Sequence, residues 1–297
     1  MNVALTGATG FIGSHVLAEL REHGHEVTAL VRDDDQADTV AARGATPAVV
    51  DLYDRAAVVS TMRTADGAVH TASPGDATSA DLDAAVVDAA IESFVGTGKP
   101  YIHVSGLWTY GANTDISEES PLDPPPLVAW KGPIEQRVLG ARDMRGVVLV
   151  SSVAYGDGAG GIPSLLLASP RDDDGNLIML GTGAQHWSTV HVADLASFFL
   201  RVLGNDSARG RYVVGDGLNP TVAELTEAAA VAVGAPGAVP GSDAEARARL
   251  GDYFAEVLLL DQGTVAAKAR TELDWNPSHP GLVEEFSHGS YRAASVD

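Results

Sequence analysis

Short apolar runs alternate with helix-like patterns through the first half of the chain. Six of these runs have the length and composition of buried strands: 2–5, 26–31, 47–52, 68–71, 101–104 and 146–150. Between the first two runs, apolar residues recur at helical spacing until Gly24, and the Ala- and Val-rich segment 81–94 predicts another helix. Because strands that alternate with helices pair in parallel, the pattern predicts an α/β fold built on a doubly wound parallel sheet.

The apolar pattern changes after Tyr155, where several glycines and Pro163 interrupt it. Farther on, 190–203 predicts a helix and 211–214 predicts a strand that returns to the sheet. The remaining sequence is mainly helical in pattern. A second structural unit is therefore expected in the C-terminal half.

These patterns divide the chain into two expected domains. Residues 1–155 and about 184–216 would form the sheet-bearing domain. Residues of about 156–183 and 217–297 would form a smaller, mainly helical lobe. We expect this lobe to cover a substrate site on the sheet.

Acidic residues outnumber basic ones by 40 to 19, which gives a formal charge of −21. Such a charge repels phosphate backbones, so nucleic acid is not an expected partner. The chain has no cysteine, which excludes disulfides and thiolate chemistry. No apolar run approaches the length of a membrane span, so we expect no membrane partner and a cytoplasmic location. The expected partner is a small-molecule substrate, and both a monomer and a homodimer remain open.

A glycine-rich turn joins the first predicted strand to the first predicted helix. Residues 5–13 read Leu-Thr-Gly-Ala-Thr-Gly-Phe-Ile-Gly. The first glycine permits a tight turn, the second lets a pyrophosphate approach the backbone, and the third allows close packing of helix and strand. The free amides at the helix N-terminus would bind the phosphates. The turn predicts a Rossmann-type dinucleotide site with these contact residues: Gly7, Thr9, Gly10, Phe11, Ile12 and Gly13.

The end of the second predicted strand indicates which dinucleotide binds. An acidic residue there would hold the adenosine ribose and exclude a 2′-phosphate, but this chain has Val31 followed by Arg32. A guanidinium can pair with the 2′-phosphate, although the acidic run 33–35 partly offsets its field. We therefore predict NADP(H) as the cofactor. The alternative is that Arg32 is an ordinary surface charge.

These features resemble the extended and atypical short-chain dehydrogenase/reductases, a superfamily that includes NAD(P)-dependent epimerase/dehydratase-like proteins, dihydroflavonol-type reductases and NmrA-like regulators. The resemblance runs nearly end to end. Beyond the glycine turn it rests on short motifs, most of which follow predicted strands: Asp51-Leu52, His70-Thr71-Ala72-Ser73, Tyr110-Gly111, Tyr155-Gly156, 190–196 and 268–277. It implies the superfamily's fold and a nicotinamide cofactor, and it does not name a substrate.

The resemblance also implies that residues at two strand ends line the cofactor. These residues are Asp51 and Leu52 beside the adenine, and Thr71, Ala72 and Ser73 beside the nicotinamide ribose. The alternative for each segment is an ordinary loop cap or turn. His70 and His191 lie in apolar patterns, and we interpret them as structural.

The catalytic pattern of the superfamily is a serine, a tyrosine and a lysine four residues after the tyrosine. Lys131 is the matching lysine and the implied ribose ligand, but Leu127 stands four residues before it and cannot donate a proton. Pro133 favours a helix that starts near Gly132, which would place Lys131 on the entry loop. The Tyr-x-x-x-Lys pair is therefore broken in this chain.

The serine position differs as well. Gly106 stands four residues before Tyr110, and Ser105 lies one residue farther back. We consider Ser105 as a relay through water and Tyr110 as the preferred substitute proton donor. Tyr155 follows another strand end and is a second candidate. Both tyrosines could instead pack beside the cofactor loops.

Three functions follow from these motifs. The main hypothesis is an NADP(H)-dependent oxidoreductase or epimerase that acts on a carbonyl or hydroxyl group of a small molecule. The alternatives are a non-redox lyase, cyclase or isomerase, and an NmrA-like NADP-sensing protein without catalysis. His186 and His191 are five residues apart without a suitable carboxylate, so no metal site is expected. Trp187 could stack on a planar substrate, or it could pin its loop as a core aromatic residue.

Overall fold

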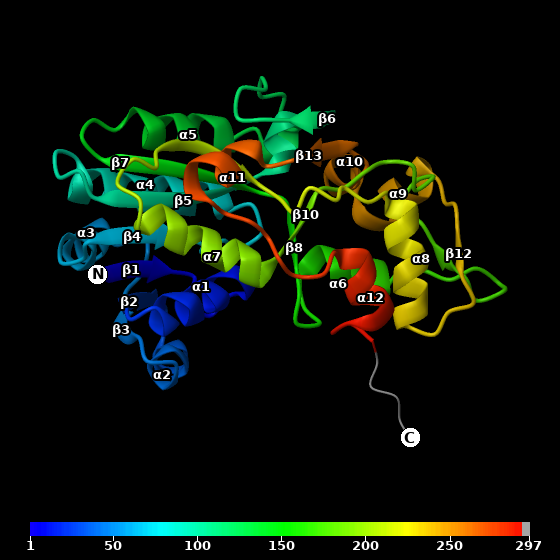
Figure 1. Ribbon diagram of the computed structural model, residues 1–297, viewed down its shortest axis with the longest axis horizontal. Helices are drawn as coiled ribbons and strands as arrows, with labels where there is room; N and C mark the ends of the chain where they lie inside the picture. Colours follow the sequence, from blue (N-terminus) through cyan, green and yellow to red (C-terminus); the bar gives the residue numbers. More distant parts are fainter. Residues whose placement is uncertain (293–297) are drawn as a thin grey trace.

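The computed structural model describes residues 1–292 and shows a sheet-bearing half beside a helical lobe (Figure 1). The main sheet contains seven strands: β1 (Asn2–Thr6), β2 (Glu26–Val31), β3 (Thr46–Val49), β4 (Gly67–His70), β5 (Pro100–Gly106), β7 (Arg145–Ser151) and β11 (Gly210–Val214). Their order is β11-β7-β5-β4-β1-β2-β3, and every neighbouring pair is parallel. The expected doubly wound parallel sheet of the Rossmann type is confirmed.

Helices cover both faces of this sheet. Alternate residues of a strand point to opposite faces, so Val3 and Leu5 lie in one apolar core and Ala4 lies in the other. The first core packs under α1 (Phe11–Glu22), α2 (Asp34–Ala42) and α7 (Val192–Leu203). The second packs under α3 (Arg55–Arg63), α4 (Ser79–Phe94) and α5 (Lys131–Gly140). Burial on both faces explains why the strands read as continuous apolar runs.

The helical lobe has its own apolar core, which includes Leu166, Leu225 and Phe286. Its helices are α6 (Gly161–Leu167), α8 (Val222–Ala232), α9 (Asp243–Leu250), α10 (Asp252–Leu258) and α12 (Leu282–His288). Three short parallel pairs complete the described strands: β8 (Val153–Tyr155) with β10 (Thr189–His191), β9 (Leu177–Ile178) with β12 (Ala238–Val239), and β6 (Asn113–Ile116) with β13 (Gln262–Thr264). Two 3₁₀ turns, η1 (Leu107–Tyr110) and η2 (Pro126–Val128), follow β5 and precede α5.

One segment near the end of the described chain packs against the sheet, although it was expected in the helical lobe. Helix α11 (Ala267–Leu273) and Trp275 belong to the apolar core of the sheet, not to the core of the helical lobe. Trp275 donates its indole N–H to the carbonyl of Asp194 on α7 at 2.9 Å. The assignment of the whole segment 217–297 to the covering lobe is therefore wrong for this part, because a fully buried tryptophan anchors it to the sheet.

Two predicted elements have different ends in the structure. The strand predicted over 47–52 stops at Val49, and Asp51 accepts a hydrogen bond from Tyr53 N at 2.9 Å, which turns the chain away from the sheet. The helix predicted over 190–203 begins only at Val192. His191 ends a short strand and caps the helix by accepting from Ala193 N at 3.2 Å.

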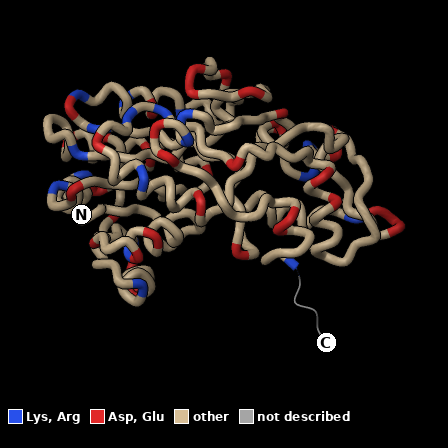
Figure 2. The backbone as a smooth tube through the Cα atoms, in the orientation of Figure 1, with Lys and Arg blue, Asp and Glu red and all other residues tan. Residues whose placement is uncertain are grey.

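Acidic residues recur along the whole described chain, in both the sheet-bearing half and the lobe (Figure 2). This distribution agrees with the formal charge of −21. Among residues 1–292, none of the helices combines the length and the hydrophobicity that a membrane crossing requires.

Candidate functional site

The glycine turn has the backbone geometry that a phosphate-binding turn needs. Gly7 has a φ of 74°, and a Cβ at this position would lie 2.6 Å from Ala72 N and 2.7 Å from Thr71 Oγ1. A Cβ on Gly13 would overlap Gly7 O and lie 2.6 Å from Thr71 Oγ1. Both glycines are therefore required for the β1–α1 turn to pack against the end of β4.

Gly10 is different because it makes no such contact. It is the N-cap of α1, and a Cβ there would meet only Gly7 O, at 3.3 Å. Thr9 and Gly10 are exposed, and Phe11 and Ile12 are partly exposed. The first N–H groups of a helix have no intrahelical partners, so this exposed N-terminus can receive an anion.

Arg32 lies just beyond β2 and is exposed. Its guanidinium forms no hydrogen bond or ion pair with residues 1–292, and its backbone N–H donates to Gln36 Oε1 at 3.2 Å. Asp33, the nearest acidic residue, caps α2 by accepting from Gln36 N at 2.8 Å. The carboxylate of Asp33 is thus engaged by its own helix, and Arg32 remains available for an anionic ligand.

The loops that follow β3 and β4 use their polar groups partly for their own turns. Asp51 is exposed and caps the turn described above, whereas Leu52 is buried in the core under α3 and α4. Thr71 Oγ1 donates to Thr6 O at 2.8 Å and so ties the β4 loop to the glycine turn. Ala72 is partly exposed and Ser73 is exposed. Their contacts with a cofactor stay a prediction.

A cavity of about 240 Å³ lies at the carboxyl ends of β5 and β7, beside the glycine turn. Open parallel sheets bind their ligands at this edge. None of its lining residues is charged: Ile12, Val104, Ser105, Gly106, Leu107, Trp108, Ser151, Ser152, Val153, Ala154, Ile162, Trp187, Ser188 and Gln262. Two larger surface hollows, one beside Arg270 and one beside Arg145, do not border the glycine turn.

Ser105 lines this cavity, but its proton is committed elsewhere. Its hydroxyl donates to Glu135 Oε1 at 2.6 Å. Glu135 is fully buried, and its other oxygen accepts from Arg211 Nε at 2.9 Å. This geometry does not support Ser105 as a proton donor to a substrate, because donation would require it to leave the Glu135 bond. The sequence did not reveal Glu135 because its partners lie 30 and 76 residues away.

Neither candidate tyrosine lies at the cavity. Tyr110 is 2% exposed, its hydroxyl has no hydrogen-bond partner within the described chain, and burial raises its pKa to about 12. Tyr155 is fully buried and donates to Pro280 O at 2.8 Å, and burial raises its pKa as well. Both fit the alternative that they are packing residues. The structure does not support Tyr110 as the substitute proton donor.

Lys131 is the first residue of α5, not part of an entry loop, and Pro133 lies in the first turn of that helix. Its Nζ lies 3.7 Å from Asp83 Oδ2 and 4.3 Å from the centre of the Trp130 ring. Burial lowers the pKa of Lys131. The ammonium is thus paired with a carboxylate from α4 and does not line the cavity.

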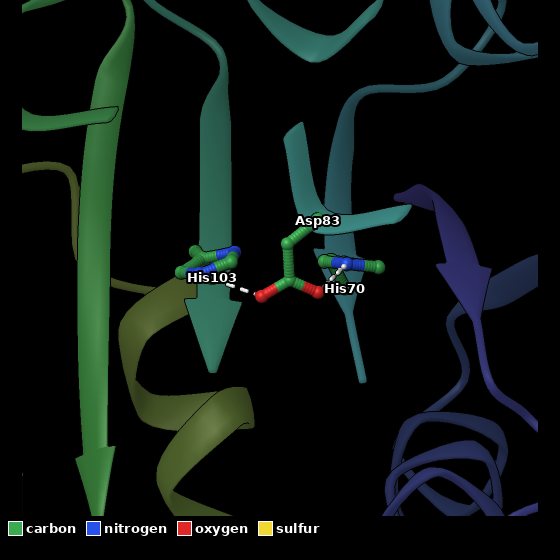
Figure 3. Close-up of side chains that lie close together, drawn as sticks. All are labelled: His70, Asp83 and His103. Atoms are coloured by element: carbon green, nitrogen blue, oxygen red, sulfur yellow. Dashed lines mark hydrogen bonds and ion pairs between the residues drawn. The ribbon is translucent and has the colours of Figure 1, made fainter. Parts of the chain in front are cut away.

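Asp83 is the centre of a buried polar cluster that was not predicted (Figure 3). His70 Nε2 lies 3.1 Å from Asp83 Oδ1, and His103 Nε2 lies 3.5 Å from Asp83 Oδ2. His70 Nδ1 also lies 2.6 Å from Thr6 Oγ1, so His70 is structural as predicted, through side-chain partners. Burial alone would raise the pKa of Asp83, but the hydrogen bond from His70 and the surrounding positive charge lower it.

The three side chains of this cluster are close enough to ligate a metal ion. However, a lysine ammonium next to the same carboxylate repels a divalent cation and already supplies the compensating positive charge. We interpret the cluster as a buried ion pair that fixes α4 and α5 to β4 and β5. The signals in the sequence were polar residues inside apolar patterns, Asp83 in a helix and His70 and His103 in strands.

His103 should make the stability of the fold depend on pH. It is fully buried among His70, Tyr101, Asp83 and Lys131, and burial lowers its pKa from 6.5 to about 3. Between these values the unfolded chain binds a proton that the folded chain does not, so stability falls as the pH falls. We expect a loss of about 1.4 kcal/mol per pH unit from this group.

The measurement is the free energy of urea unfolding between pH 7 and pH 4, for the natural chain and for His103→Phe. The variant should show a shallower decline over this range. Ile102→Val, at an equally buried position without an ionisable group on the same strand, serves as the control and should leave the slope unchanged. Equal slopes for His103→Phe and the natural chain would contradict the assignment.

The histidine and tryptophan that shortly precede β10 have structural partners. His186 Nδ1 lies 2.9 Å from Asp261 Oδ1, and both side chains are half-exposed. Trp187 is 5% exposed and donates its indole N–H to Leu258 O at 3.0 Å. Trp187 therefore pins its loop to α10, and its ring also lines the cavity.

Comparison with known proteins agrees with this architecture. An uncharacterised protein of Schizosaccharomyces pombe is 27% identical over 98% of this chain and 100% of its own length. A protein named 3-diazoavenalumate denitrifying reductase, from a Streptomyces species, is 28% identical over 94% of this chain and 97% of its own length. The similar proteins and solved structures bear the names of epimerases, dehydratases, one reductase and one dehydrogenase.

Solved structures show the same fold. The human epimerase family protein SDR39U1 with NADPH has a TM-score of 0.75 at 20% identity, covering 98% of this chain and 99% of its own. UDP-glucose 4-epimerase of Thermus thermophilus with NAD has a TM-score of 0.72 at 22% identity, covering 97% of this chain and 99% of its own. The sequence pattern of the NAD dependent epimerase/dehydratase family matches residues 3–215. Together with the parallel sheet and the glycine turn, this match shows that the chain belongs to that family.

Proposed function

We propose that this protein is an NADP(H)-dependent oxidoreductase that moves a hydride to or from a small, uncharged molecule in the cavity beside Ile12. The observation that carries the proposal is the glycine turn. Gly7 and Gly13 pack against Thr71, and this packing leaves the N-terminus of α1 exposed at the edge of the cavity. A bound dinucleotide would supply the hydride from its nicotinamide ring.

The preference for NADP(H) rests on Arg32. Its guanidinium is exposed and has no partner among the described residues, whereas Asp33 caps α2. A 2′-phosphate would provide Arg32 with a charge-assisted hydrogen bond. Val31, which precedes Arg32 at the end of β2, cannot bind the two ribose hydroxyls of NAD as an acidic residue would.

The missing Tyr-Lys pair favours a hydride acceptor that does not depend on those two groups for a proton. Leu127 is 37% exposed on η2, and Lys131 is held by Asp83. The name of one relative, 3-diazoavenalumate denitrifying reductase, describes a reduction in which nitrogen is lost. An acceptor that expels nitrogen when it takes up a hydride needs no proton donor at an oxygen atom, which suits this site. This relationship supports reduction over epimerisation.

The test measures dissociation constants for NADPH and NADH, and then NADPH oxidation with a panel of carbonyl and diazo compounds. We expect tighter binding of NADPH and consumption of NADPH by at least one acceptor. Arg32→Ala should raise the dissociation constant for NADPH by about 10- to 100-fold, because a charged hydrogen bond is lost, and should leave NADH binding unchanged.

Arg43→Ala is the matched control because Arg43 is an exposed arginine at the opposite end of α2. It should leave the affinity for NADPH unchanged. Equal binding of NADPH and NADH would refute the cofactor assignment. Product formation without net oxidation of NADPH would favour an epimerase or another non-redox enzyme, and tight binding with neither would favour a sensor.

A further inference from the structure

We infer that the cavity selects a compact, planar, uncharged aromatic carbonyl compound, and that Ser188 is the hydrogen-bond donor that orients it. This inference rests on the proposed function, because it names the substrate class of the same site. It is carried by the size of the cavity, its lack of charge and the hydrogen bonds among its polar groups.

Size limits the substrate first. The cavity measures about 240 Å³, below the range of about 300–1,000 Å³ that is typical of ligand pockets. An engineered cavity of about 150 Å³ holds a benzene molecule. The end of the cavity beside Ile12 borders the glycine turn, so part of this volume would receive the nicotinamide ring. The remaining space suits a molecule with one ring.

The chemistry of the walls limits the substrate further. No lysine, arginine, aspartate or glutamate lines the cavity, so a diphosphate or carboxylate would be buried there without a counter-charge. Nucleotide sugars therefore do not fit this site. Two indole rings form part of the wall. Trp187 is fixed by its bond to Leu258 O, and Trp108 packs edge-on against Phe254 at 6.3 Å between ring centres. Fixed aromatic walls favour a flat aromatic ligand.

The hydroxyl and amide groups of the cavity leave one donor uncommitted. The other groups already donate hydrogen bonds within the protein. The Ser105 hydroxyl donates to Glu135, and the Ser151 hydroxyl donates to Ser152 O. The Ser152 hydroxyl donates to Ser188 Oγ at 2.9 Å, and Gln262 Nε2 donates to Leu107 O and Gly111 O. Within residues 1–292, Ser188 Oγ accepts from Ser152 and donates to no other group. The bond from Ser152 polarises the Ser188 hydroxyl and makes it a better donor. An oxygen acceptor on the substrate would complete this chain. When the hydride of NADPH forms a C–H bond at the carbonyl carbon, the electron pair of the C=O π bond would pass to this oxygen, which Ser188 hydrogen-bonds and which takes its proton from water in the solvent-open cavity, so that NADPH becomes NADP⁺ and the carbonyl becomes an alcohol.

Gly215 supports the same assignment. A Cβ at this position would lie 2.6 Å from Ser152 Oγ and 2.8 Å from Ser188 Oγ. Any larger residue would therefore displace the two hydroxyl groups. The backbone of the segment that follows β11 is shaped to leave room for the Ser152–Ser188 pair.

The experiment compares three probes in the presence of NADPH: benzaldehyde, 4-carboxybenzaldehyde and UDP-glucose. Turnover is followed by NADPH oxidation, and binding is followed separately by saturation-transfer NMR of the probe protons with NADP⁺ present. We expect benzaldehyde to bind, and its kcat/KM to exceed that of 4-carboxybenzaldehyde by about 100-fold or more, because the added carboxylate would be buried unpaired. UDP-glucose has no carbonyl group to reduce and serves as a binding probe only; it should not bind.

Ser188→Ala should lower kcat/KM for benzaldehyde about 10-fold through the loss of one hydrogen bond. Ser169→Ala is the control, because Ser169 is also buried but lies outside the cavity and its hydroxyl has no partner among the described residues. Binding of UDP-glucose, or turnover of 4-carboxybenzaldehyde at the rate of benzaldehyde, would overturn the substrate class. Equal kinetics of the two serine variants would overturn the role of Ser188. If benzaldehyde binds but does not oxidise NADPH, the carbonyl class fails while the oxidoreductase proposal is decided by the carbonyl and diazo panel above. Binding of benzaldehyde but not of the charged probes still supports the selectivity of the cavity.

Discussion

Replacing Gly13 with alanine is expected to destabilise the sheet-bearing half of the chain by about 3 kcal/mol, the upper part of the usual range for overpacking. The added Cβ would overlap the carbonyl oxygen of Gly7 and lie 2.6 Å from Thr71 Oγ1. Thr71 in turn is bonded to Thr6 O at the end of β1, so the β1–α1 turn and the β4 loop would have to move together. The measurement is the free energy of urea unfolding, followed by circular dichroism.

Gly10→Ala is the matched control in the same turn. Its Cβ would meet only Gly7 O at 3.3 Å, and its φ of −80° is open to alanine, so this variant should remain folded with nearly natural stability. Its affinity for NADPH should fall, because the new methyl group would stand where the pyrophosphate approaches the backbone. If Gly13→Ala unfolds at the same urea concentration as Gly10→Ala, the packing argument is wrong.

Asp83→Ala is the second change with a large expected effect, a loss of about 3–5 kcal/mol of stability. The substitution removes the only carboxylate of the buried cluster and leaves the Lys131 ammonium without a partner there. His70 would also lose the acceptor of its Nε2–H. Replacing both members of the pair, as Asp83→Leu with Lys131→Met, should recover most of the loss, because no unpaired charge remains buried.

The control for this cycle lies on the same helix. Asp88 pairs with Arg137, but their side chains are 45% and 38% exposed. An exposed ion pair contributes about 1 kcal/mol or less, so Asp88→Ala should be mild. The natural chain, Asp83→Ala, the double variant Asp83→Leu with Lys131→Met, and Asp88→Ala are compared by urea unfolding without cofactor. A double variant as unstable as Asp83→Ala alone would show that Lys131 is not the partner of Asp83.

The local sequence pattern was sufficient to predict the sheet and the glycine turn. The apolar runs located the strands because both faces of a parallel sheet are buried, and the spacing of Gly7, Gly10 and Gly13 located the turn. The ends of the strands were predicted less accurately. The run beyond Val49 looked like a strand but leaves the sheet, because the side chain of Asp51 hydrogen-bonds the backbone.

The candidate site was less predictable because its polar groups find their partners far away in the sequence. Ser105 looked free in the sequence, yet Glu135 takes its proton. Tyr110 follows a strand end, as a catalytic residue would, yet its ring is buried in the core. Ser188 was not singled out, because its partner Ser152 is 36 residues away and nothing near either serine marks the pair.

The order of the strands in the sheet has a consequence for how the chain is made. The interior strand β1 is synthesised first, whereas β11 at one edge comes from residues Gly210–Val214 and pairs with β7. Until the ribosome has released that strand, the edge of β7 has no neighbour on that side. Unpaired edges of apolar strands are where chains associate with one another. The nascent protein is therefore most exposed to aggregation while residues 152–209 are being added, and a chain truncated before Gly210 would keep that open edge permanently.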